Sequence, residues 1–170
     1  MKIPVKNIEE TFEEIAGPEG VQVYRLLKNK EDVNEFNIAE KLKITINQLR
    51  NIIYKFEKYN LLTSIRKKDR KKGWYIYFFT LNPKQIDDTV VQLVRDKMSI
   101  IEKQLDREKA HQFYLCPNRC VRQTIENAME NQFMCHECGS LLDAENNDKT
   151  INKMQKRIEE LNIKLKELSK

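Results

Sequence analysis

Apolar residues recur every three or four positions through the first sixty residues, which is the period of an amphipathic helix. The segment VKNIEETFEEIAG predicts a helix that stops at Gly17 and Pro18, and EGVQVYRLLKNK predicts a second helix. In NIAEKLKITINQLRNIIYKFEKYNLL, a short and a longer apolar face are separated by KIT, with Thr45 or Asn47 available as a helix cap. This arrangement predicts a helix-turn-helix.

The pattern changes to that of strands after residue 60. LLTSIR and WYIYFFTL are rich in β-branched and aromatic residues, and they flank the polar segment KKDRKKG, which ends in glycine. Because neighbouring strand residues face opposite sides, about half of the aromatic rings should belong to the core. Helices followed by a two-stranded hairpin predict a winged helix domain over residues 1–82.

Two further helices are predicted, each with a single apolar seam. A long one follows Pro83, a residue suited to a helix start, and covers residues 83–113 as a linker; the other covers residues 146–170. Their apolar residues fall at alternating intervals of three and four: Val91, Val94, Met98, Ile101 and Leu105, then Ile151, Met154, Ile158, Leu161, Leu165 and Leu168. Such a seam needs a partner, so an antiparallel pairing within the chain and a coiled coil between chains are both open.

The expected fold class is mostly α with a small amount of β structure. Charged residues make up 34% of the chain, mean hydropathy is -0.69, and there are four glycines, too few and too scattered for a phosphate-binding loop. No GxSxG motif, signal peptide or membrane-length apolar run is found in the sequence. We therefore expect a cytoplasmic protein that is not an enzyme and has reduced cysteines.

Net charge is +5, and it is unevenly distributed. Residues 1–82 carry +5, residues 83–115 are neutral, residues 116–145 carry -3, and the remainder carries +3. RKKDRKK, residues 66–72, has six positive charges and one negative charge. The hairpin of the predicted winged helix is therefore the most basic part of the chain.

All four cysteines lie in residues 114–145, in the motifs CPNRC and CHECG: Cys116, Cys120, Cys135 and Cys138. Two tight pairs separated by fourteen residues are typical of a structural zinc ribbon, in which four thiolates surround one Zn²⁺. Disulfides and a redox role are alternatives that a reducing compartment disfavours. His111 and His136 are interpreted as bystanders, since four thiolates already complete the coordination shell.

Two surfaces are candidates for binding. The first is the wing, where cations adjoin aromatic rings that can stack on bases or insert into a partner: Arg66, Lys67, Lys68, Arg70, Lys71, Lys72, Trp74 and Tyr75. The second is the outer face of the longer helix of the helix-turn-helix, which could face a DNA groove with Arg50, Tyr54 and Lys55. An ordinary solvated helix face has the same composition, so this second signal is weaker.

In its module order, the chain resembles archaeal transcription factor E, the counterpart of the alpha subunit of eukaryotic transcription factor IIE. The resemblance rests on IAEKLKITINQLRNIIYKFEKYNLL, on GWYIYFF after a charged wing, and on CPNRCVRQTIENAMENQFMCHECGSLL. One departure is CPNRC, with three residues between cysteines where two are usual.

The resemblance implies a basal initiation factor without catalytic activity, which binds RNA polymerase at its clamp and stalk. It also implies a promoter complex with the TATA-binding protein and transcription factor B, and contact with the single-stranded non-template strand when the promoter melts. The alternative is a sequence-specific regulator that dimerises through its helical seams and recognises operators with the helix-turn-helix.

Overall fold

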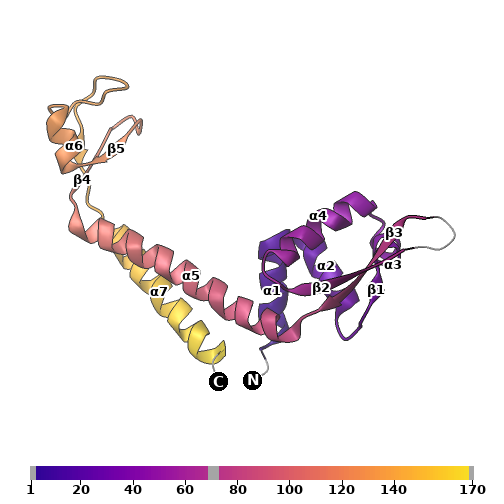
Figure 1. Cartoon of the computed structure of the whole chain (residues 1–170). Helices are drawn as coiled ribbons and strands as arrows, with labels where there is room; N and C mark the ends of the chain where they lie inside the picture. Colours follow the sequence, from indigo (N-terminus) through magenta and orange to yellow (C-terminus); the bar gives the residue numbers. More distant parts are fainter. Residues whose placement is uncertain (1–2, 69–72, 169–170) are drawn as a thin grey trace. The chain divides into compact units, whose positions relative to one another are not determined.

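The structure is a computed structural model that describes residues 3–68 and 73–168. The chain divides into two compact units, Met1–Leu93 and Val94–Lys170, and the long helix α5 (Pro83–Ala110) continues from one into the other. Figure 1 shows helices as the main elements, with two small antiparallel sheets. The expected fold class, mostly α with little β structure, is confirmed.

The first unit consists of a helical bundle and a hairpin. Its elements before α5 are α1 (Val5–Ala16), α2 (Pro18–Leu27), β1 (Val33–Asn34), α3 (Glu35–Leu42), α4 (Ile46–Glu57), β2 (Leu62–Lys68) and β3 (Tyr75–Leu81). Helices α1 and α2 meet at Gly17, whose φ of 78° lies in the left-handed region. Gly20 allows close packing, because a Cβ there would lie 2.7 Å from the Cβ of Ala16.

Three aromatic rings occupy the centre of this unit. The ring of Phe12 stacks on that of Tyr24 at 4.6 Å and meets that of Phe56 edge-on at 4.8 Å between centroids. Around them lie apolar side chains from α2, α3, α4 and both long strands, including Val23, Leu27, Ile38, Leu49, Ile52, Ile53, Leu61, Leu62 and Phe79. Apolar burial of this extent is the main stabilising contribution to a small domain.

The helix-turn-helix has well-defined ends. Thr45 is the N-cap of α4: its hydroxyl accepts from the backbone N–H of Gln48, and the Gln48 side chain accepts from the backbone N–H of Thr45. This capping box selects Thr45 over Asn47 as the cap. In the preceding turn Lys43 takes a left-handed conformation, with φ of 54°, which ends α3.

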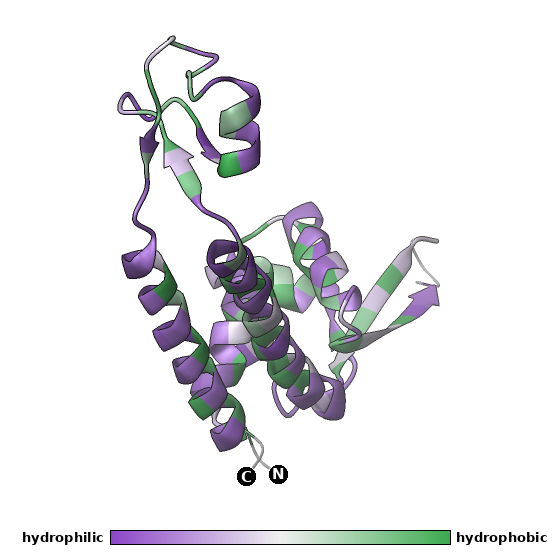
Figure 2. Cartoon of the chain, turned by 90° about the vertical axis from the view of Figure 1, so that its left-hand side faces the viewer, coloured by the Kyte–Doolittle hydropathy of each residue, from purple (hydrophilic) through white to green (hydrophobic). Residues whose placement is uncertain are grey.

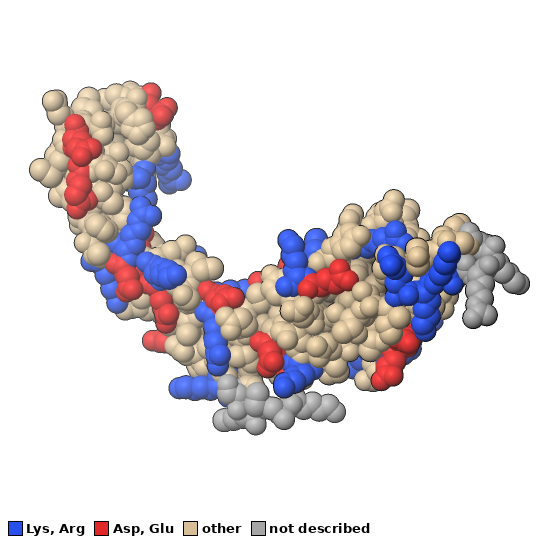
Figure 3. Space-filling model, in the orientation of Figure 1, with Lys and Arg blue, Asp and Glu red and all other residues tan. Residues whose placement is uncertain are grey.

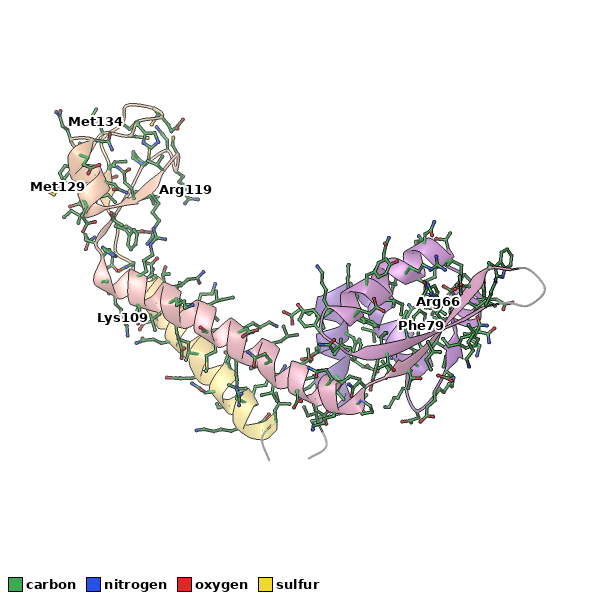
Figure 4. The ribbon with its side chains drawn as sticks, viewed as in Figure 1. Arg66, Phe79, Lys109, Arg119, Met129 and Met134 are labelled. Atoms are coloured by element: carbon green, nitrogen blue, oxygen red, sulfur yellow. The ribbon has the colours of Figure 1, made fainter. Side chains whose placement is uncertain are left out.

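Strands β2 and β3 form the wing, and β1 adds a short third strand in the order β1-β3-β2. The register pairs Arg66 with Tyr77 and Lys68 with Tyr75, so these residues share one face. Figure 4 labels Phe79 nearer the helices and Arg66 farther out along the hairpin.

Burial of the wing's aromatic rings follows distance from the helices. Phe79 is buried, Tyr77 and Phe78 are half-buried, and Tyr75 and Trp74 are exposed. Phe79 belongs to the core cluster and Tyr77 packs against it, so two of the five rings are core, close to the half that was expected. Alternation along a strand buries side chains only where other residues cover one face of the sheet, and the outer part of the hairpin extends past the helices that provide this cover.

The second unit holds the four cysteines and the tail helix. Its elements after α5 are β4 (Phe113–Leu115), β5 (Arg122–Thr124), α6 (Ile125–Glu130), β6 (Asp143–Ala144) and α7 (Asp148–Leu168), with strand order β5-β4-β6. The buried cluster under the ribbon is small, and two of its four members are thiols: Cys116, Ala128, Cys135 and Leu142.

Helix α7 runs antiparallel beside the later half of α5, as both Figure 1 and Figure 2 show. The apolar seams of the two helices supply the buried residues Leu105, Leu161 and Leu168. Ile101 of α5 and Met154 of α7 line one shared groove. Of the two pairings left open by the sequence, the structure therefore contains the one within the chain.

A polar cluster fastens the ribbon to these helices. The Arg122 guanidinium donates two hydrogen bonds to the carboxylate of Glu108, at 2.9 and 2.8 Å, and lies 3.9 Å from the centroid of the Phe113 ring. Asn147 donates to both the backbone and the side chain of Glu108 at 2.9 Å. The end of α5, strand β5 and the start of α7 therefore share one partly buried carboxylate.

Candidate functional site

The four cysteine sulfurs lie within 4.8 Å of one another, and the Sγ atoms of Cys116 and Cys138 are 3.5 Å apart. A zinc ion bonded to four thiolates at about 2.3 Å places the sulfurs of a regular tetrahedron about 3.8 Å apart. The observed spacing therefore fits a tetrathiolate metal centre. The cluster can hold a metal ion, and Cys116 and Cys135 form its buried side.

The first knuckle accommodates its extra residue through Arg119. The backbone N–H of Arg119 donates to the carbonyl of Cys116 at 2.7 Å, and Arg119 itself has φ of 56°. This left-handed residue turns the chain so that Cys120 rejoins the cluster. The departure in CPNRC is thus absorbed in the turn and does not remove a ligand.

The second knuckle makes its left-handed turn one residue later than the first, counted from the first cysteine of each pair. Gly139, with φ of 72°, follows Cys138, and its N–H donates to the carbonyl of Cys135 at 2.8 Å. The two turns are joined across the cluster by Asn118, whose amide nitrogen lies 3.5 Å from the sulfur of Cys138 and 3.2 Å from the hydroxyl of Ser140.

These contacts give the thiols very different acidities. Hydrogen bonds from Ser140 and Asn118 lower the pKa of Cys138 from an ordinary 9.0 to about 5. Hydrogen bonding to Cys138, followed by burial, raises the pKa of Cys120 to about 12, and burial raises the pKa of Cys135. Four crowded sulfurs cannot all ionise without a cation, and a bound metal replaces their protons.

Neither histidine joins the cluster. The imidazole of His136 lies 3.4 Å from the carboxylate of Glu137, and that of His111 lies 3.6 Å from Glu126. Among the residues that the structure describes, the grouped metal-ligating side chains are the four cysteines alone.

The wing presents cations and rings together. The Arg66 guanidinium carbon lies 4.3 Å from the centroid of the Tyr75 ring, and the Lys67 ammonium lies 4.7 Å from that of Phe78. Tyr75 is 48% exposed and Trp74 51%. Figure 3 shows Lys and Arg side chains gathered on this part of the surface. Three predicted wing residues, Arg70, Lys71 and Lys72, lie outside the described residues.

The outer face of α4 contains the three predicted recognition residues, but they differ in their surroundings. Tyr54 is 60% exposed, and Lys55 is exposed as well. Arg50 is held inward by a carboxylate: its Nε and Nη2 atoms each donate to Glu35 at 3.1 Å. Of the three predicted recognition residues, Tyr54 and Lys55 are therefore exposed, whereas Arg50 is engaged by Glu35.

Glu35 is the main residue that the sequence analysis missed. Its side chain is fully buried at the first position of α3, and it also accepts from the backbone N–H of Tyr77 at 3.2 Å. It therefore joins α3, α4 and the wing. An acidic residue directly after the N-cap Asn34 is a signal of helix-end stabilisation, but it does not reveal this pairing.

The ribbon also exposes apolar residues that the sequence analysis did not single out. Met129, Met134 and Leu141 are 61%, 43% and 62% exposed, and Met134 pairs with Leu141 in an isolated β-bridge. Figure 4 labels Met129 and Met134 at the outer end of the ribbon. In the described part of the chain, no helix is long and apolar enough to cross a membrane.

Comparisons with known proteins agree with this architecture. The family model of the TFIIE alpha subunit matches residues 6–110. Transcription factor E of Cenarchaeum symbiosum (strain A) is 32% identical over 148 residues, covering 86% of both chains.

Two further relatives are also transcription factor E proteins. That of Metallosphaera sedula is 28% identical, with 91% of each chain covered. That of Methanothrix thermoacetophila is 31% identical, with 89% of this chain and 90% of the relative covered. The winged helix, the long helix and the cysteine ribbon of this chain are therefore those of a member of the transcription factor E and TFIIE alpha family, which are transcription initiation factors.

Proposed function

We propose that this protein binds RNA polymerase in the promoter complex and stabilises the melted state of the DNA. Its wing contacts the polymerase clamp and the non-template strand, while its ribbon, built on one structural Zn²⁺ held by Cys116, Cys120, Cys135 and Cys138, contacts protein at the clamp and stalk. TATA-binding protein and transcription factor B are the expected members of the same complex. The net charge of -3 on residues 116–145 favours a protein partner over DNA for the ribbon.

The observation that carries the proposal is the exposed aromatic and cationic end of the wing. Ile65, Trp74 and Tyr75 are each about half-exposed, beside the cations of β2. Flat rings accept stacked bases of any sequence, and cations attract the phosphate backbone. A single strand offers unstacked bases, whereas a closed duplex does not.

Binding the melted state more tightly than the duplex is enough to stabilise it. One base stacked on a ring contributes about 1–3 kcal/mol, which shifts an opening equilibrium by about 5- to 150-fold. The wing needs no bond-making chemistry for this effect. The proposal therefore concerns differential binding, which a direct measure of opening can test.

The test is permanganate reactivity of thymines in the bubble, using polymerase, the promoter factors and zinc-loaded full-length protein. The wing variant R66Q/K67Q/K68Q/W74A is expected to lose most of the added reactivity. The matched variant K6Q/K41Q/K84Q removes three exposed lysines of the same unit outside the hairpin and should behave as wild type. Full reactivity with the wing variant would contradict the proposal.

The alternative function, recognition of an operator through α4, predicts tight binding of the protein alone to one duplex sequence. The engagement of Arg50 by buried Glu35 weighs against it, because a guanidinium that serves a carboxylate must break two hydrogen bonds before it contacts a base. A mobility shift on duplex and bubble DNA separates the two functions. The initiation factor should prefer the bubble.

A further inference from the structure

A second basic surface lies on α7, in the unit that does not contain the wing. We infer that Lys149, Lys153, Lys156 and Arg157, here termed the α7 stripe, form a contact site for the phosphate backbone of duplex DNA. All four side chains are exposed. They are spaced at four, three and one residues, which places them on one side of a helix.

The stripe borders two grooves. One, of about 660 Å³, is lined by the stripe with Asn152 and Glu160. The other, of about 440 Å³, adds uncharged residues of α5 and α7: Ile101, Gln104, Thr150 and Met154. Glu160, which accepts from Arg157 at 2.7 Å, is the single acid among these lining residues. Lys149 and Lys153 also line the second groove, and no carboxylate is among the residues that line it.

The arrangement costs the isolated helix stability. Like charges four residues apart repel, as in the pair Lys149 and Lys153 and the pair Lys153 and Arg157. Lys149 also lies in the first turn of α7, where the helix dipole favours anions over cations. Positions that break a local rule in this way are where a functional contact is expected. A bound polyanion removes both penalties.

Duplex DNA fits this surface better than an acidic protein face. The stripe extends over about 12 Å of helix at a rise of 1.5 Å per residue, and DNA presents charge continuously over such a length. Asn152, Gln104 and Thr150 add amide and hydroxyl donors, which make many of the phosphate contacts in protein–DNA complexes. None of these side chains suits recognition of one base sequence, so the contact is expected to be independent of sequence.

The test is fluorescence anisotropy of a labelled duplex with zinc-loaded full-length protein, titrated with salt. If the three lysines neutralise one phosphate each, wild-type affinity should fall about 40-fold more than that of K149Q/K153Q/K156Q between about 50 and 200 mM salt. The control variant K103Q/K109Q/K166Q removes three exposed lysines of the same unit outside both grooves. It should retain the wild-type salt dependence, as should K149R/K153R/K156R.

Three results would overturn the inference: equal losses in the test and control variants, unchanged duplex binding in the test variant, or a loss seen only with an acidic protein partner. Circular dichroism and zinc content establish folding. Because neutralising the stripe relieves repulsion between its charges, the test variant should melt at the same temperature as the wild type or at a higher one. A lower melting temperature would contradict the claim that these charges destabilise α7. The wing is unaltered in these variants, so the result stands apart from the proposed function.

Discussion

The first unit and the ribbon of the second unit differ in how many apolar residues they bury. Met1–Leu93 buries fifteen apolar residues in one cluster around Phe12 and Phe56. The cluster beneath the ribbon has four members, of which Cys116 and Cys135 are also candidate metal ligands. A fold of about 30 residues buries too little apolar surface to be stable alone, and a metal supplies the missing free energy. We therefore expect the ribbon, unlike the first unit, to depend on a bound metal for its stability.

The sharpest way to break this comparison is to remove a buried thiol. Cys135→Ser should reduce zinc from one ion per chain to nearly none and leave the ribbon unfolded, since three ligands leave the shell incomplete. Native mass spectrometry measures the stoichiometry, and amide NMR spectra report on each unit. Ser140→Ala alters a neighbouring polar residue without removing a ligand and should retain the ion. Stoichiometric zinc in Cys135→Ser would refute the four-thiolate assignment.

The converse change tests the apolar core. Phe56→Ala removes a fully buried ring and should lower the free energy of unfolding of the first unit by about 3–5 kcal/mol. Zinc content should not change. Phe36→Ala is the matched control, because its ring is 41% exposed and its loss should cost less than about 1 kcal/mol. Similar costs for the two variants in denaturant unfolding would contradict the assigned core.

A smaller effect is expected at the buried carboxylate that joins the helices to the wing. Glu35→Ala should destabilise the first unit by about 2 kcal/mol, less than for a fully buried ion pair because the Arg50 side chain is 36% exposed. Glu40→Ala, on the exposed side of α3, serves as the control. If Glu35 also orients the wing, its loss should reduce promoter opening at temperatures where the protein stays folded. No change in stability would exclude the pair as a structural element.

The smallest effect is a pH dependence in the second unit. Hydrogen bonding from Arg122 is the main cause that lowers the pKa of Glu108 below its ordinary 4.5. The ion pair thus contributes its full stability above about pH 4.5, and the contribution is lost as pH falls through the lowered folded-state pKa. The melting difference between wild type and Glu108→Gln should therefore shrink from about pH 7 to about pH 3.5. Acid also releases zinc, but it does so from both proteins and therefore does not account for a change in the difference between them. A melting difference that stays constant with pH would contradict the stabilising role of the ion pair between Glu108 and Arg122.

Local patterns in the sequence predicted the features that depend on residues close together in the chain. A cap for α4 was expected at Thr45 or Asn47, and the structure has it at Thr45; the grouping of the four thiols follows from the spacing of two short knuckles. Features that depend on where elements cross were not predictable. Glu35 and Arg50 are fifteen residues apart, and their pairing requires the packing of α3 on α4.

The same distinction applies to the wing. Strand periodicity correctly indicates that β3 residues alternate between faces, but it carries no information on how far the hairpin extends beyond its cover. Tyr75 and Phe79 lie on the same face, and only Phe79 is buried. In CPNRC, likewise, the left-handed turn at Arg119 is a response to closure of the cluster, and arginine shows no strong preference for that conformation.

Hydrogen exchange on the full-length protein, with and without a zinc chelator, tests the central contrast most directly. We expect chelation to abolish the protection of amides in residues 113–145 and to leave the amides of α1, α2 and α4 protected as before. Equal loss of protection in both units, or a ribbon that stays protected after its metal is removed, would contradict it.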